Sequence, residues 1–121
     1  MSIHVVNLIE KSSLIKELHA YKRIASMNNY DFKLVKVHRE FIWHKHPDTD
    51  EVFLGVEGSF EIHLRDKVLS IHPGDLVSIP KNVDHKPVCK TPCTILLIEP
   101  RGTLNTGDTG GDLTDTEVED I

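Results

Sequence analysis

From residue 41 to residue 99 the sequence alternates between short apolar stretches and turn-forming residues, and this pattern most constrains the fold. The expected strands cover residues 41–46, 51–56, 59–65, 68–72, 76–79, 85–89 and 94–99. Turn-forming residues such as Gly58, Gly74 and Pro92 separate them. Many short strands at near-regular spacing predict a β-sandwich or a β-barrel.

The expected strand at residues 59–65 alternates apolar with polar side chains, which is typical of an antiparallel strand buried on one face. The same period of two begins earlier, at residues 32–37, after a turn expected at Asn28-Asn29. The strand-rich region therefore starts about a quarter of the way along the chain.

The first third of the chain contains the only expected helix. Ser12 or Ser13 is expected to cap a short helix that continues through residues 14–19. Before it, residues 3–6 have the apolar and β-branched composition of a strand. Such a strand can pair with the same segment of a second copy.

Length and charge narrow the class of protein. The 121 residues are enough for one domain with a single core, and the net charge is −5. No basic stripe interleaved with aromatic residues is present, which argues against nucleic-acid binding. No apolar run approaches the roughly 20 residues of a membrane span, and no export signal is visible, so a cytoplasmic location is expected.

The two cysteines flank a short turn. Cys89 and Cys93 are separated by Lys90-Thr91-Pro92, which predicts a hairpin. In a chain without an export signal, two such residues are expected to be reduced thiols in neighbouring strands rather than a disulfide. They are also too few for a structural zinc site.

His44 and His46 are two residues apart, so on a strand both imidazoles point to the same face. Glu51 opens the next expected strand and can fold back towards them, and His85 follows a second turn much later in the chain. Three imidazoles and one carboxylate suit Fe(II), Mn(II), Ni(II), Co(II) or Zn(II). The alternative is that His44 and His46 are surface residues on an edge strand.

Two motifs with these residues resemble the signatures of the cupin superfamily. His44-x-His46-x4-Glu51-x6-Gly58 matches the first, and Gly74-x5-Pro80-x4-His85 matches most of the second. The resemblance implies an all-β fold, a jelly-roll (double-stranded β-helix) barrel with the four residues as metal ligands in its mouth.

The whole chain is similar to a group of small single-domain bacterial cupins. The similarity implies an N-terminal strand and helix segment at residues 1–30 packed on the barrel, a cupin barrel at 31–101, and an acidic, Gly- and Thr-rich extended tail at 102–121. Members of this group are often labelled phosphomannose-isomerase-like by distant similarity, and that label is not transferred here as an activity.

Three positions depart from the cupin signatures. His38 stands in place of a leading glycine, Asn82 in place of a usual glycine, and Cys89 in place of an asparagine. Asparagine tolerates a left-handed backbone better than most residues, so the turn before His85 is expected to form. None of the departures removes a ligand.

Residues near the ligands are candidates for further roles. Lys36, His38 and Glu40 share the parity of His44, unless a turn near Arg39 breaks the count; each is a catalytic candidate, with a solvated surface as the alternative. Parity places Phe53 on the face of Glu51, where it is expected to wall the pocket, and Trp43 on the face opposite His44, where it is expected to pack between sheets or at a subunit contact. Glu99 and Arg101 are expected either to bind a substrate carboxylate or to form a salt bridge with each other at the rim.

Three functions are compatible with these features. The first is a metal-dependent enzyme, an isomerase, epimerase, lyase or dioxygenase, acting on a small polar molecule such as a sugar or keto acid. The second is a non-enzymatic module that binds or senses a small ligand through the same metal, and the third is a purely structural metal. A homodimer formed through a sheet edge is the expected assembly, with the tail as an alternative contact.

Overall fold

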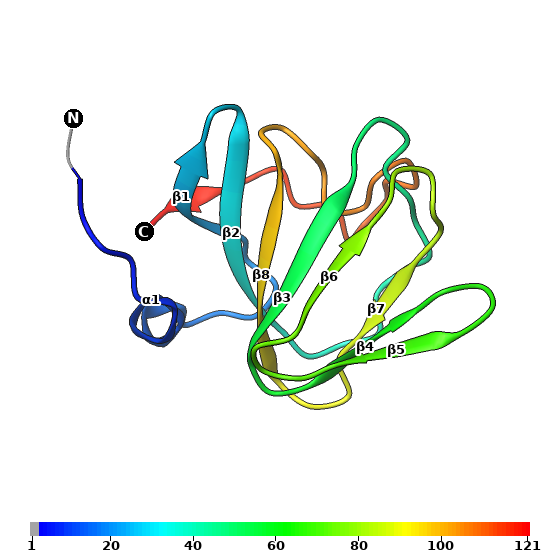
Figure 1. The fold of residues 1–121 in the computed structure, drawn as a ribbon, viewed down its shortest axis with the longest axis horizontal. Coiled ribbons are helices and arrows are strands. Elements are labelled where there is room, and N and C mark those ends of the chain that lie inside the picture. Colours follow the sequence, from blue (N-terminus) through cyan, green and yellow to red (C-terminus); the bar gives the residue numbers. More distant parts are fainter. Residues whose placement is uncertain (1–2) are drawn as a thin grey trace.

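The computed structural model describes residues 3–121, which form two sheets facing each other (Figure 1). The elements are α1 (Leu8–Leu14), β1 (Lys22–Met27), β2 (Tyr30–Val37), β3 (Glu51–Glu57), β4 (Phe60–His63), β5 (Val68–Ile71), β6 (Leu76–Ile79), β7 (Lys86–Val88), β8 (Cys93–Pro100) and β9 (Glu119–Asp120). The larger sheet has the order β6-β3-β8-β2-β1-β9, and the smaller has the order β5-β4-β7. This arrangement confirms the predicted all-β jelly roll.

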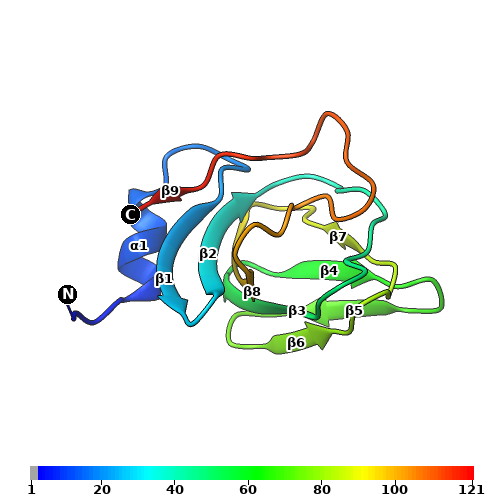
Figure 2. The same ribbon diagram turned by 90° about the horizontal axis from the view of Figure 1, so that it is seen from above.

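The main core lies between the two sheets, as the view from above makes clear (Figure 2). Val35 on β2, Phe53 on β3 and Ile95 on β8 meet Phe60 and Ile62 from β4. β3 and β4 alternate buried with partly exposed side chains, so one face of each of these strands supplies this core. The turn expected at Asn28-Asn29 is also present, with Asn28 at a φ of 55°.

A second, smaller core lies on the outer face of the larger sheet. Leu34 and Leu96 pack there against Ile15, which follows α1. The helix therefore covers the outer face of the larger sheet, while the space between the sheets holds the main core and the functional site.

The helix lies earlier in the chain than predicted. The structure places it at Leu8–Leu14 and not at residues 14–19, because the side chain of Asn7 accepts a hydrogen bond from the Glu10 amide and caps it. Ser12, expected as a cap, is instead inside the helix and fully buried, where its hydroxyl lies 3.0 Å from that of Thr94.

The strand predicted at residues 3–6 does not form. This segment has no regular structure, and Ile3 and Val5 are 91% and 96% exposed. The free edge of β1 is occupied instead by β9, which pairs with it in parallel near the C-terminus. A strand needs a partner edge, and within this chain the C-terminal residues take it.

The predicted strand at residues 41–46 is replaced by an irregular segment. Two isolated β-bridges join this part of the chain to the segment around β7: Glu40 with Val88, and His44 with His85. The other predicted strands of the barrel are present with ends that differ by a few residues. No helix in residues 3–121 is long and apolar enough to cross a membrane.

Cys89 and Cys93 lie on opposite sides of the predicted turn, at the end of β7 and the start of β8. Both are buried free thiols, and the Cys93 thiol donates to the sulfur of Cys89 at 2.9 Å. This agrees with the prediction of reduced thiols.

Candidate metal centre

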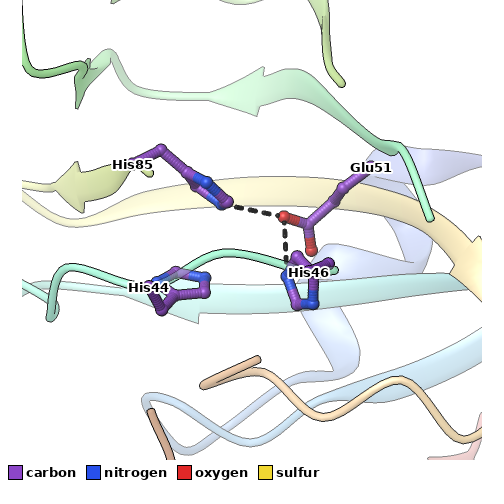
Figure 3. Close-up of side chains that lie close together, drawn as sticks. All are labelled: His44, His46, Glu51 and His85. Carbon is purple, nitrogen blue, oxygen red and sulfur yellow. Dashed lines mark hydrogen bonds and ion pairs between the residues drawn. The ribbon is translucent and has the colours of Figure 1, made fainter. Parts of the chain in front are cut away.

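Four side chains from three separate segments converge in the mouth of the barrel (Figure 3). His44 and His46 come from the irregular segment before β3, Glu51 opens β3, and His85 directly precedes β7. All four are at least 95% buried, and one ligand atom from each lies within 4.8 Å of the others. The structure thus brings together all four residues that the sequence indicated.

Backbone carbonyls orient two of the imidazoles. His44 donates from Nδ1 to the carbonyl of Ile42 at 2.9 Å, and His85 donates from Nδ1 to the carbonyl of Val83 at 2.9 Å. A carbonyl oxygen only accepts, so in each ring Nδ1 carries the hydrogen and Nε2 is directed into the site. This is how metal-binding histidines are usually held.

The turn before His85 is formed by Asn82, as predicted. Asn82 has a φ of 67°, a left-handed conformation that asparagine tolerates, and its amide donates to the carbonyl of His46 at 3.0 Å. This hydrogen bond fixes the segment that carries His85 against the segment that carries His44 and His46. The missing glycine of the second signature therefore does not disturb the site.

Glu51 is held in the centre of the cluster by hydrogen-bonding groups. Its Oε1 lies 3.1 Å from Nε2 of His85 and 3.2 Å from Nε2 of His46 (Figure 3). Burial opposes ionisation of this carboxyl, but the adjacent Glu99, His46 and His85 side chains outweigh it and hold the pKa of Glu51 well below its usual value. Glu51 is therefore available as a carboxylate.

The pKa values of two histidines move in opposite directions. Burial, reinforced by the nearby His85, lowers the pKa of His44 to about 4, so its ring is neutral at neutral pH. Burial also acts against the charged form of His85, but the adjacent Glu51 carboxylate prevails and raises the pKa of His85 above its usual value. The carboxylate beside it thus makes His85 easier to protonate than His44.

The donor set fits a divalent transition metal. Nε2 of His46 is buried and makes no hydrogen bond within residues 3–121, although it lies near Glu51. Such an orphaned nitrogen is costly unless something binds it. Imidazole nitrogens with a single carboxylate suit zinc, iron, manganese, nickel or cobalt.

Residues 32–99 match the family model described as a cupin domain. This segment is more than half of the chain and contains all four residues of the cluster. The chain belongs to the cupin family.

Three relatives place this cupin among small bacterial members of the family. It is 35% identical over 81 residues to the uncharacterized protein YdbB of Bacillus subtilis, covering 66% of this chain and 72% of YdbB. A cupin-2 domain containing protein from Shewanella frigidimarina shares 48% identity with a TM-score of 0.78, over 80% of this chain and 95% of that one. Protein NMB1881 from Neisseria meningitidis shares 31% identity with a TM-score of 0.72, over 80% and 99%.

The aromatic residues beside the ligands lie as their parity predicts. Phe53 is buried in the barrel with its ring edge-on to His85, the centroids 5.9 Å apart. Trp43 is on the opposite face from His44, where the Arg65 guanidinium stacks at 3.8 Å from the ring centroid. Trp43 is thus a surface contact, not a wall of the pocket.

The catalytic candidates upstream of the ligands lie outside the site. His38 and Glu40 are exposed; the ring of His38 contacts the Lys90 carbonyl at 3.2 Å, and Glu40 pairs with Lys86. Lys36 is on the outer face of β2. The solvated-surface alternative is therefore correct for His38 and Glu40.

Glu99 and Arg101 do not form the predicted pair at the rim. Arg101 is half exposed and bonds to Asp31 at 3.2 Å. Glu99 is fully buried behind the cluster, where the Lys33 ammonium lies 2.6 Å from its Oε1. Burial and the Glu51 carboxylate together raise the pKa of Glu99 well above its usual value.

A cavity inside the barrel adjoins the cluster, with His44 and Glu51 in its wall. Three of its polar lining residues, Tyr21, Arg39 and Asn105, were missed by the sequence analysis. These three residues do not belong to either cupin signature and lie at no characteristic distance in sequence from the ligands. Asn105 lies in the tail. Every second residue of a strand faces the same side, and Arg39 is in step with the inward-facing Val35 and Val37 of β2. A count back from His44 in steps of two reaches His38 instead, so it passed over Arg39.

The tail packs against the segment that carries the histidines. Asp108 donates from its amide to the carbonyl of Lys45 at 3.0 Å, and the Thr109 hydroxyl donates to the carbonyl of Trp43 at 2.9 Å. Asn105 and Thr106 are buried beneath it. The tail therefore supports the backbone on both sides of His44, a role that its composition did not indicate.

Proposed function

We propose that this cupin is a metal-dependent enzyme acting on a small polar molecule, with an ion held by His44, His46, Glu51 and His85. The observation that carries the proposal is the cavity beside the cluster, with His44 and Glu51 in its wall. Structural metal sites are closed by their ligands, whereas catalytic sites keep a position open to water or substrate. The isomerase, epimerase, lyase and dioxygenase classes all use such an open position.

The chain's own residues prepare this site in three ways. Hydrogen bonds to backbone carbonyls keep Nε2 of His44 and His85 directed inwards. Glu99, buried behind the cluster, helps to hold the pKa of Glu51 low and so keeps Glu51 available as a carboxylate. Phe53 and its apolar neighbours exclude water from the inner side. When bound, the ion supplies a Lewis acid for a substrate oxygen or, if it is iron, a centre that reacts with oxygen.

The proposal is tested by metal analysis of protein purified without chelator, followed by an activity screen. The protein is reloaded with each of iron, manganese, nickel, cobalt and zinc, and tested against sugar phosphates, uronates, diketones and keto acids while oxygen uptake is followed. Turnover with one ion supports the enzyme. Tight ligand binding without turnover under any ion would instead favour the binding or sensing module.

A matched pair of histidine variants tests the ligand assignment. We expect His46→Ala to lose most of the bound metal and to melt at a lower temperature, because the ion stabilises only the folded state. His72→Ala, at an exposed site 65% accessible in its side chain, is the control and should retain the wild-type metal content. Wild-type stoichiometry in His46→Ala would contradict the assignment.

A further inference from the structure

The cavity that adjoins the cluster has apolar walls and one unpaired cation. Its apolar lining comes from strand residues, among them Val35, Phe53 and Leu97. Its polar lining, apart from the cluster itself, consists of Tyr21, Arg39 and Asn105. The nature of a ligand is therefore set by what these three side chains can still bind.

Asn105 is already occupied by the tail. Its amide nitrogen donates to the carbonyl of Leu113 at 2.8 Å, and its carbonyl oxygen accepts from the amide of Asp115 at 2.8 Å. Tyr21 remains a neutral donor, because burial raises the pKa of its hydroxyl far above neutral pH. Asn105 thus serves to fix the tail, and Tyr21 has a hydroxyl suited to an acceptor.

Arg39 has no partner for its charge. Its Nε is buried and makes no hydrogen bond within residues 3–121, and none of the ion pairs in that range includes its guanidinium. The guanidinium carbon lies 4.8 Å from the centroid of the Phe41 ring, which orients the group but does not neutralise it. A buried donor without an acceptor is destabilising unless a ligand supplies one.

We propose that the cavity binds a short-chain oxygenated monocarboxylate, such as a 2-oxo or 2-hydroxy acid, whose carboxylate pairs with Arg39 and whose second oxygen faces His44 and Glu51. The inference rests on the proposed function, since the second oxygen points to the site of the ion. A planar guanidinium matches a carboxylate in a two-point contact. Tyr21 can donate a further hydrogen bond to the same group.

The size and the walls of the cavity argue against a sugar. Its volume is only about 30 Å³, so a ligand has to be compact and has to extend from the cavity towards His44 and Glu51. A hexose or hexose phosphate is much larger, and each of its hydroxyl groups would lose water against apolar walls without gaining a partner. A small acid has one strongly polar end, which meets Arg39, and a short apolar part, which suits the walls.

The test measures binding of pyruvate and lactate to the metal-loaded protein by titration calorimetry. Hydroxyacetone, which lacks the carboxylate, and mannose 6-phosphate are the comparison ligands. We expect pyruvate and lactate to bind more tightly than either. No binding of pyruvate or lactate by fully metal-loaded protein, or tighter binding of mannose 6-phosphate, would overturn the inference while leaving the proposed function intact.

Two arginine variants and one control locate the contact. Arg39→Gln should weaken pyruvate binding at least about tenfold, as expected for the loss of a charge-assisted pair, and leave hydroxyacetone binding and metal content unchanged. Arg39→Lys retains the charge without the two-point contact, so its pyruvate affinity should lie between those of the wild type and Arg39→Gln. Arg65→Gln, at an exposed arginine stacked on Trp43, is the control and should bind pyruvate like the wild type.

Equal pyruvate affinity in the wild type and in both Arg39 variants would exclude Arg39 as the carboxylate contact. If the Arg39 variants melt at a different temperature but bind pyruvate with unchanged affinity, Arg39 is likewise excluded as the carboxylate contact and contributes to the stability of the fold instead. If the wild-type protein binds no metal, the proposed function fails. Pyruvate titrations of the metal-free wild type and of the metal-free Arg39 variants would still decide whether Arg39 binds the carboxylate.

Discussion

At the scale of single residues, the centre depends on groups behind the ligands as much as on the ligands. Lys33 is 3% exposed and its ammonium is the cation that contacts Glu99, which in turn contacts Glu51. Removing one member of a buried polar network leaves the others without a partner. The pair behind Glu51 is therefore expected to be important for stability.

We predict that Lys33→Met lowers the free energy of unfolding by about 1–3 kcal/mol, because it leaves the buried Glu99 carboxyl without the ammonium that contacts it. Urea denaturation of the metal-free protein measures it. Lys36→Met is the matched control, since it is on the same strand but on the outer face and half-buried, and should change the free energy by less than about 0.5 kcal/mol. Equal effects of the two variants would contradict the prediction.

The proton on His85 predicts how metal binding depends on pH. The Glu51 carboxylate raises the pKa of His85 above its usual value, and the ion can bind its Nε2 only after the proton leaves. Apparent metal affinity should therefore rise with pH from about 6 to 8, through the range just above the usual histidine pKa of about 6.5. Chelator competition at fixed ionic strength measures it, and a flat profile would show that His85 does not bind the ion.

At the scale of elements, the tail is the segment whose importance is hardest to foresee. Gly107 has a φ of 55° and lies directly against the segment with the histidines, so that an added Cβ would be 2.2 Å from the carbonyl oxygen of Lys45. This contact leaves no room for any side chain at Gly107.

We predict that Gly107→Ala destabilises the protein by about 1–3 kcal/mol more than Gly110→Ala and lowers metal affinity, because the tail must move away from His44. Gly110 is the matched control: its φ of 66° imposes the same backbone strain, but an added Cβ there meets no atom within 4 Å. Thermal unfolding and chelator competition measure both effects. Equal losses in the two variants would mean that the tail does not support the site.

At the scale of the whole molecule, the homodimer inferred from the sequence remains a prediction. The N-terminal segment is not a strand within the single chain, and its Ile3 and Val5 side chains are almost wholly exposed. Exposed apolar residues in an extended segment suit pairing with a second copy.

We expect analytical ultracentrifugation to find a dimer whose dissociation constant rises at least about tenfold when Ile3 and Val5 are both changed to Ser. The double substitution of Leu14 and Leu18 to Ser, at exposed apolar sites near the helix, is the control and should leave the dimer unchanged. A monomeric wild-type protein would contradict the prediction of a dimer, and an unaffected dimer in the Ile3 and Val5 variant would place its interface elsewhere.

The sequence by itself determined the barrel and the four residues of its centre. Short strands separated by turns form sheets that bury one face. The cluster of four residues forms even though the predicted strand at 41–46 is irregular, and it consists of His44, His46, Glu51 and His85. The helix was misplaced, because two adjacent serines offered a cap that Asn7 provides instead.

Only the tertiary structure decided what surrounds the centre. The inward-facing positions are odd-numbered from Val35 to Phe41 but even-numbered at His44, so a count back from His44 in steps of two pointed to His38 and passed over Arg39. A local irregularity of this kind leaves no mark in a two-residue period. Asn105 reaches the cavity through contacts between residues far apart in the chain, which depend on how the tail folds back and not on its composition.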